Sequence, residues 1–187
     1  MRRFGIAGLC AAVAGLAVPA IAQQKDARPI RVDAPRTSLF SDVARAAWYS
    51  INELVIASAE RMPAEHYGFR PARDVRTFAQ ILAHIADNHH AACGPTIGRP
   101  RPDTSFDRLQ TKDELTKALR ESAAVCDLAY GILTDQNAAF RYPAFNSEYT
   151  RFALLVSNIT HNSEHYGNLV TYMRLKAVVP PSTAGIK

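Results

Sequence analysis

The chain has 187 residues, 48% of them hydrophobic, and a formal net charge of +5. This length suits one domain that buries about two-thirds of its unfolded surface. The 22 lysines and arginines are spread along the chain without a basic run, which argues against nucleic acid as a partner.

The first 22 residues have the pattern of an export signal. Arg2 and Arg3 precede an uncharged stretch, residues 4–18, and Ala20 and Ala22 are small residues at the positions that a signal peptidase reads. The stretch is short for a membrane span, which needs roughly 17–25 residues. We therefore expect residues 1–22 to be a cleaved signal peptide. The mature protein would be periplasmic or secreted, without a stable membrane span, and its net charge would fall to +3 because two arginines leave.

Residues 23–37 are mostly polar, with two prolines, and predict a flexible N-terminal segment. The remainder, residues 38–187, predicts one all-α domain. Apolar residues at helical spacing indicate four helices, at about 38–62, 77–93, 112–133 and 149–176, and no strand pattern is visible.

The first predicted helix ends before Pro63. Its apolar stripe consists of Phe40, Val43, Ala47, Ile51, Leu54, Val55 and Met62.

Two capping boxes mark the next two helices: Thr77 with Gln80, and Thr111 with Glu114. The second helix carries the stripe Phe78, Ile81, Leu82, Ile85 and Ala92. The third carries Leu115, Ala118, Leu119, Ser122, Cys126, Ala129, Tyr130 and Leu133. The links between helices have roughly 14 to 17 residues, against the usual 2–8 in bundles, so we expect ordered caps over the bundle ends and a crossover between parallel neighbours.

The fourth predicted helix has two distinct sides. One apolar stripe, which we expect to be the packed side, consists of Phe152, Leu155, Val156, Ile159, Tyr166, Val170 and Met173. His161 and His165 lie almost opposite, on a side shared with Leu154, Asn158, Asn168 and Tyr172. At a spacing of four residues, two imidazoles lie on one helix face and can converge on one metal ion.

A third ligand would come from the second helix, which contains His84, His89 and His90. Helical geometry favours His84, at the edge of the apolar stripe, over His89, which lies within the stripe. His90 points away and is expected to be exposed. Asp87, one turn after His84, could orient a ligand through a hydrogen bond.

The same residues match a second motif. His161, Glu164 and His165 fit H-x-x-E-H, the inverted zinc-protease pattern, in which Glu164 would be the general base. Such proteases need a further acidic ligand downstream, and no Asp or Glu follows His165. This interpretation is therefore a remote alternative.

The segment from His161 to Lys176, His-Asn-Ser-Glu-His-Tyr-Gly-Asn-Leu-Val-Thr-Tyr-Met-Arg-Leu-Lys, resembles the DinB superfamily. Residues 67–71, 76–78 and 82–87 strengthen the likeness, which covers about residues 38–182. The resemblance implies a four-helix bundle of up-down-down-up topology and a divalent metal held by His84, His161 and His165. The superfamily includes transferases and isomerases that use cytosolic thiols, and a leader for export departs from that setting.

Three histidine ligands leave a coordination position open, as in catalytic metal sites. We therefore expect a metal-dependent hydrolase or transferase acting on an unknown small molecule, or alternatively a non-catalytic metal- or ligand-binding module. Zn, Ni, Fe and Mn all remain candidates, and a homodimer stays open. The candidate pocket-lining residues are Asp87, Asn88, Asn158, Asn168 and Tyr172.

Two cysteines would survive cleavage, Cys93 and Cys126. Because an exported protein meets an oxidising compartment, this pair is a candidate disulfide. Two buried free thiols are the alternative.

Overall fold

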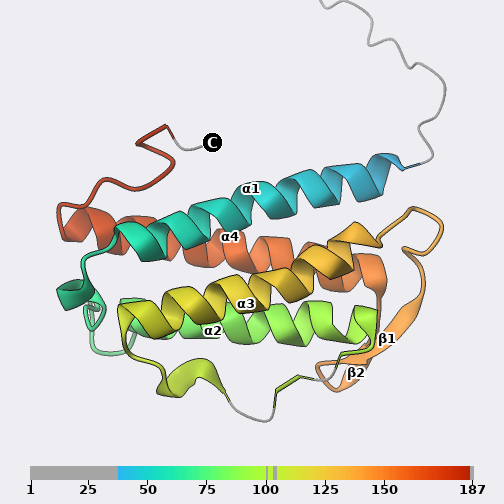
Figure 1. The fold of residues 1–187 in the computed structure, drawn as a ribbon, viewed down its shortest axis with the longest axis horizontal. Coiled ribbons are helices and arrows are strands. Elements are labelled where there is room, and N and C mark those ends of the chain that lie inside the picture. The colour runs from blue at the N-terminus through green and yellow to red at the C-terminus, as the bar shows by residue number, and fades with distance from the viewer. Residues whose placement is uncertain (1–37, 100, 103–104, 186–187) are drawn as a thin grey trace, which may run out of the picture. The chain divides into compact units, whose positions relative to one another are not determined.

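The computed structural model describes residues 38–99, 101–102 and 105–185, which belong to one structural unit, residues 35–187. The predicted signal peptide, residues 1–22, and the predicted flexible segment, residues 23–37, lie outside the described residues. Four long helices lie side by side in this unit (Figure 1): α1 (Leu39–Arg61), α2 (Phe78–Cys93), α3 (Lys112–Gly131) and α4 (Arg151–Leu175). The predicted all-α bundle is confirmed, with helix ends within two residues of those expected.

The helices begin where their capping residues predict. The Thr77 hydroxyl accepts a hydrogen bond from the Gln80 N–H at 3.1 Å, and the side-chain oxygen of Gln80 accepts one from the Thr77 N–H at 2.9 Å. Thr111 and Glu114 form the same reciprocal pair at α3. Two donors of the first turn are satisfied in each case, which fixes where α2 and α3 start.

Contacts at the helix ends define the direction of each helix. The Lys112 ammonium group donates to the carbonyls of Glu60 and Met62, which places the start of α3 at the end of α1. Arg45, near the start of α1, donates to the carbonyl of Tyr130 at the end of α3. The two helices are therefore antiparallel.

The second and third helices run in the same direction, and α4 runs opposite to them (Figure 1). The Tyr172 hydroxyl, near the end of α4, donates to the Arg76 carbonyl just before α2. These directions agree with the predicted up-down-down-up order. Each of α1 and α2 packs on both α3 and α4.

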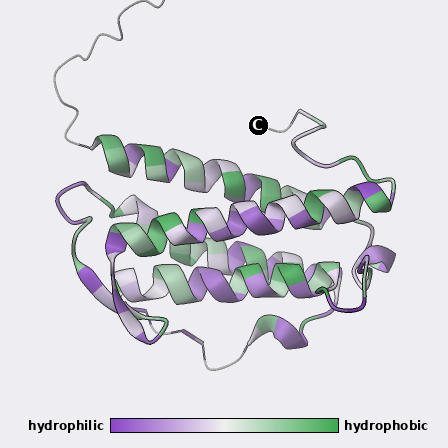
Figure 2. Ribbon diagram, turned by 180° about the vertical axis from the view of Figure 1, so that it is seen from behind, coloured by the Kyte–Doolittle hydropathy of each residue, from purple (hydrophilic) through white to green (hydrophobic). Residues whose placement is uncertain are grey.

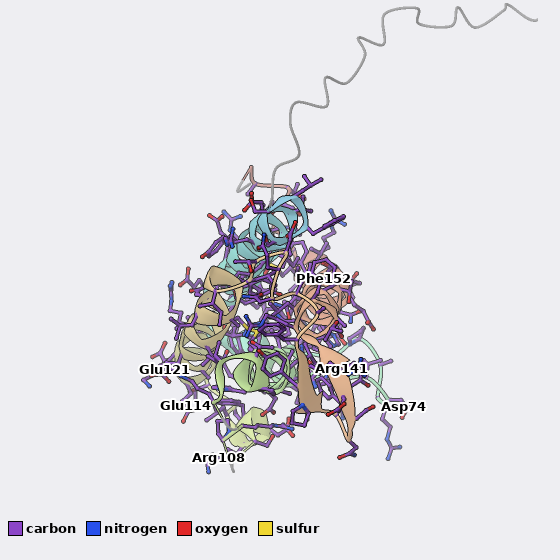
Figure 3. The ribbon with its side chains drawn as sticks, turned by 90° about the vertical axis from the view of Figure 1, so that its right-hand side faces the viewer. Asp74, Arg108, Glu114, Glu121, Arg141 and Phe152 are labelled. Carbon is purple, nitrogen blue, oxygen red and sulfur yellow. A yellow bond between two sulfur atoms is a disulfide. The ribbon has the colours of Figure 1, made fainter. Side chains whose placement is uncertain are left out.

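The core consists of two apolar clusters, and Trp48 lies at the heart of the second. Its ring is fully buried, stacks on Tyr130 at 5.0 Å between centroids, and meets the edge of His89 at 5.1 Å. Its indole N–H donates to the Asp127 carboxylate at 2.8 Å. Every residue of the stripes predicted for the second and third helices is buried. Charged side chains such as Glu114, Glu121 and Arg141 point outwards (Figure 3).

The buried faces of α1 and α4 differ from the predicted stripes. Phe40 and Val43 are 64% and 62% exposed, because α1 turns its Ala44 and Trp48 face inwards at this end. The face of α4 that packs most deeply lies between the two predicted sides, because it takes Leu155 and Met173 from the apolar stripe and four residues from the histidine side. Its buried residues are Arg151, Leu154, Leu155, Asn158, Asn162, His165, Leu169, Tyr172 and Met173. Each helix carries both hydrophilic and hydrophobic residues along its length (Figure 2).

The prediction that the chain has no strand is wrong. Strands β1 (Arg141–Ala144) and β2 (Ser147–Thr150) form an antiparallel hairpin between α3 and α4. Its two-residue turn, Phe145 and Asn146, has positive φ angles of 49° and 62°, the backbone that tight hairpins require. The turn has no Asn-Gly or Asp-Gly pair, the usual sequence signal of a two-residue hairpin turn. The hairpin could therefore not be predicted from the sequence.

The other links contain short 3-10 helices: η1 (Ala64–His66) after α1, and η2 (Gly94–Ile97) and η3 (Phe106–Arg108) between α2 and α3. The described residues include no helix long and apolar enough to cross a membrane.

The end of α2 is joined to α3 by a disulfide between Cys93 and Cys126, whose α-carbons are 5.1 Å apart. Both residues are fully buried. The bond links two parallel helices that are joined in sequence by residues 94–111.

We expect removal of this disulfide to destabilise the protein. The bond closes a loop with a sequence separation of 33 residues, and the loss of loop-closure entropy in the unfolded chain predicts a cost of about 3 to 4 kcal/mol. Urea unfolding of the Cys93→Ala, Cys126→Ala protein would measure it. An unchanged midpoint would show that the two thiols are not bonded in the native protein.

Candidate metal centre

Three histidines meet where α2 and α4 face each other. His84 lies two turns into α2, and His161 and His165 lie one turn apart on α4. One nitrogen from each ring falls within 4.8 Å of the others. Among the described residues, these are the three that form such a cluster.

The rings present their nitrogens to one another. The Nε2 atoms of His84 and His161 are 3.0 Å apart, and the ring centroids of the three pairs lie 4.4 to 4.9 Å apart. Two nitrogens bound to one tetrahedral ion at 2.0–2.1 Å are about 3.4 Å apart. The rings therefore need only small adjustments to share one ion.

Burial is the largest cause that lowers the pKa of each of these imidazoles. The pKa values of His161 and His165 fall to about 4, first because burial penalises the charged ring and then because a neighbouring histidine would repel it. Burial also lowers the pKa of His84. All three rings are therefore neutral at pH 7, the form in which imidazole binds metals.

The remaining ring nitrogens differ in their surroundings. Nδ1 of His165 lies 3.3 Å from the side-chain amide of Asn168, which can orient the ring. Nδ1 of His161 is buried without a hydrogen-bond partner in the described part of the chain. The helix thus holds His161 by packing, while Asn168 supports His165.

Two cavities flank the triad. The first, of about 500 Å³, has His84 in its wall, and the second, of about 570 Å³, has His165. Both volumes are in the range of small-molecule sites. Arg76 and Gln80, from the start of α2, line both cavities.

The structure distributes the five predicted pocket residues differently. Asp87 and Asn88 line the first cavity, and Asn168 and Tyr172 line the second. Asn158 lies in neither cavity. It is fully buried, where its amide contacts Asn88 at 3.1 Å and the Tyr130 hydroxyl at 3.2 Å.

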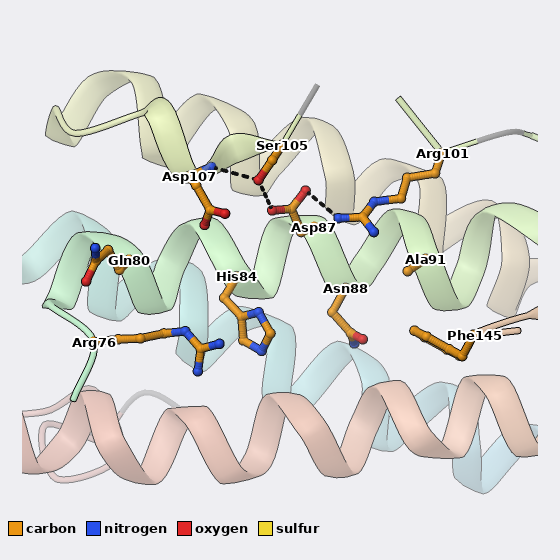
Figure 4. Close-up of a pocket in the computed structure, with 10 residues that line it drawn as sticks. All are labelled: Arg76, Gln80, His84, Asp87, Asn88, Ala91, Arg101, Ser105, Asp107 and Phe145. Atoms are coloured by element: carbon orange, nitrogen blue, oxygen red, sulfur yellow. Dashed lines mark hydrogen bonds and ion pairs between the residues drawn. The ribbon is translucent and has the colours of Figure 1, made fainter. Parts of the chain in front are cut away.

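Asp87, which we expected to support a metal ligand, forms no hydrogen bond with a histidine among the described residues. Its carboxylate accepts hydrogen bonds from the Ser105 hydroxyl at 2.9 Å and from Arg101 at 3.2 Å (Figure 4). It also accepts from the Phe106 N–H. These partners belong to the link after α2. The hydrogen bonds of Asp87 therefore hold that link against the helix.

The other two histidines of α2 lie outside the triad. His89 is fully buried, with Nδ1 3.0 Å from the Ser122 hydroxyl and Nε2 2.9 Å from the Asn162 amide. His90 is half-buried and stacks on Phe106 at 5.6 Å, so the prediction that it is exposed is wrong. The link folds back over His90, a contact that helical periodicity does not reveal.

Several cavity residues escaped the sequence analysis. Gln80 was seen only as a capping residue and Arg76 only as part of the family resemblance, while Arg101 and Ser105 come from a link with no periodic pattern. Phe145 reaches the first cavity from the hairpin turn (Figure 4). Glu164, the candidate base, is exposed and lines the second cavity.

A sequence model of the DinB superfamily matches residues 47–169 of the chain. Among solved structures, a DinB-like protein from Bacillus cereus ATCC 10987 is similar, with a TM-score of 0.65 and 15% identity over 75% of this chain and 95% of that one. A DinB-like protein from Bacillus subtilis has a TM-score of 0.54 and 19% identity, over 72% of this chain and 92% of its own.

A conserved protein from Enterococcus faecalis has a TM-score of 0.57 and 16% identity, over 72% of this chain and 95% of its own. At such identities the structural likeness shows the fold alone. No curated protein matches the chain.

We expect acid to destabilise the fold through His89. Burial lowers its pKa from 6.5 to about 3. The unfolded chain therefore takes up a proton near pH 6.5 while the folded state does not, and stability falls as the pH falls from about 6.5 towards 3. The slope contributed by one such group is about 1.4 kcal/mol per pH unit.

The comparison of wild type with His89→Gln isolates this contribution. The free energy of unfolding, measured between pH 4 and 6, should fall less steeply in the variant. Equal slopes for the two proteins would contradict a neutral, buried His89.

Proposed function

The chain belongs to the DinB superfamily, and on that premise we propose that His84, His161 and His165 bind one divalent metal ion in a hydrolase or transferase acting on a small molecule. The convergence of three neutral imidazoles from two helices carries this proposal. Without an ion, the Nε2 atoms of His84 and His161, which are 3.0 Å apart, can share at most one hydrogen bond.

The donor set favours a borderline metal. Imidazole suits Zn, Ni and Fe, whereas Mn also accepts histidine but prefers oxygen. Three protein ligands leave at least one position for substrate, as in catalytic rather than structural zinc sites. When bound, such an ion would act as a Lewis acid on a substrate oxygen.

The chain's own residues would hold and shield the substrate. The two cavities give it room on both sides of the triad, and Asn88 and Asn168 offer side-chain amides to it. Phe145 would cover the first cavity from the hairpin turn. The Tyr172 hydroxyl already donates to the Arg76 carbonyl, so it would position the start of α2.

A second candidate is a binding module without turnover. Among the described residues, no carboxylate joins the histidine cluster. Asp87 is engaged with Arg101 and Ser105, and Glu164 is exposed. A reaction that needs a strong general base therefore has no obvious one, and the lack of a carboxylate ligand also disfavours the inverted-motif protease.

We also propose that the protein is exported. The leader-like pattern of residues 1–22 would direct the protein to the periplasm or the medium, and the buried disulfide between Cys93 and Cys126 suits such an oxidising compartment. We propose a small molecule as the partner rather than nucleic acid. A homodimer remains a candidate that gel filtration would test.

We expect the metal-free protein to bind one equivalent of Zn²⁺ in a calorimetric titration. His161→Ala and His84→Ala should each weaken binding roughly 100-fold or more, equivalent to about 2.7 kcal/mol, because two ligands hold an ion poorly. His90→Ala is the matched control, since it removes a neighbouring α2 imidazole outside the triad. Equal affinity for all four proteins would contradict the site.

A substrate panel separates the enzyme from the binding module. For an enzyme, hydrolysis or transfer measured on small esters, amides and activated acyl donors should disappear on chelation and return with added Zn²⁺. Tight zinc binding with no turnover across the panel would favour the module.

A further inference from the structure

Arg76 is placed where it can reach a molecule bound at the triad. It immediately precedes Thr77, the first capping residue of α2, and its carbonyl is held by the Tyr172 hydroxyl at 2.9 Å. Its side chain extends towards His84 (Figure 4). It is also one of two residues that line both cavities, so it stands between them.

The Arg76 guanidinium group has no ion-pair or hydrogen-bond partner in the described part of the chain. The other arginine of the first cavity, Arg101, is instead paired with Asp87 at 3.2 Å. Acidic residues do line the cavities: Asp87 and Asp107 in the first, and Asp74 and Glu164 in the second. None of them forms an ion pair with Arg76, so its donors are free for an incoming acceptor.

The positive charge of Arg76 acts on the three histidines of the triad. It is among the causes that lower the pKa of His84, of His161 and of His165, in each case after burial. Coulomb energy falls with distance and is screened by salt over about 8–10 Å. This effect agrees with the position of Arg76, which lines both the cavity that contains His84 and the cavity that contains His165.

We propose that the site takes a small molecule bearing an oxyanion, a carboxylate or a phosphoryl group, which pairs with Arg76 while a second polar group of the same molecule lies at the triad. This inference rests on the proposed function. A planar guanidinium fork matches the two oxygens of either group. A cavity of about 500 Å³ with a mostly polar wall also fits a small polar molecule better than a large apolar one.

Gln80 would assist Arg76. It lines both cavities, and its side-chain oxygen is already used to accept the Thr77 N–H. The group that Gln80 can still offer to a ligand is therefore its amide NH₂, a donor. The start of α2 thus presents a cation and an amide donor beside the imidazoles, a combination that selects for negative charge.

Hydroxamates test this inference, because they bind a metal through one end and can carry a chosen group at the other. Butyrohydroxamate has a neutral tail, succinomonohydroxamate replaces its methyl group with a carboxylate, and 3-phosphonopropionohydroxamate replaces it with a phosphonate. Their affinities for the zinc-loaded protein are measured by calorimetry. The variants are Arg76→Gln and, as a matched control, Arg73→Gln, which removes an arginine that lines the second cavity alone.

We expect one or both charged hydroxamates to bind wild type at least 10-fold more tightly than butyrohydroxamate. That gain should disappear in Arg76→Gln and persist in Arg73→Gln, while butyrohydroxamate binds all three proteins alike. The tail with the larger gain identifies the anion as carboxylate or phosphoryl.

Two results overturn the inference in distinguishable ways. If charged and neutral hydroxamates bind wild type equally, or if the gain survives in Arg76→Gln, Arg76 does not select an anion although the metal site stands. If no hydroxamate binds and no zinc is retained, the metal site itself fails, and the inference fails with it.

Discussion

Three pairs of polar side chains form the middle of the contact between α2 and α4, and the candidate metal centre depends on them. Asn88 meets Asn158, His84 meets His161, and His89 meets Asn162, each pair within about 3.1 Å. Buried polar atoms cost free energy unless they are paired. This polar seam therefore fixes the register of the two helices more sharply than apolar side chains would, since sliding by one turn would break every pair at once.

The apolar clusters hold the seam in place. One includes the first half of α2 together with the end of α4, and the other joins the first half of α1 to the last turns of α3 around Trp48. The seam thus lies between well-packed regions that supply the stability it lacks. A row of polar pairs between two helices contributes little stability by itself. It suits a site that must present neutral nitrogens to a cation and leave room for a ligand beside them.

The sequence predicted those parts of the fold that local patterns determine. Capping boxes located α2 and α3, and helical spacing identified their buried stripes, because both signals act within a few residues. The buried face of α4 was misassigned since its core includes Asn158, Asn162 and His165, and a hydrophobic pattern overlooks a polar face that packs inwards. Spacing also paired His161 with His165, and helical geometry favoured His84 over His89, a choice that the family resemblance then settled. The partners of Asp87 and the exposure of His90 depend on a link that folds back over α2, which no local pattern encodes.

The account as a whole requires one ion bound by these three imidazoles and by no other protein group. X-ray absorption at the zinc edge of the zinc-loaded protein measures this directly. We predict three imidazole nitrogens at about 2.0–2.1 Å together with a light-atom ligand that exchanges when a hydroxamate is added. A shell containing sulfur or protein carboxylate, or one that is unchanged when His84, His161 and His165 are replaced, would contradict the account.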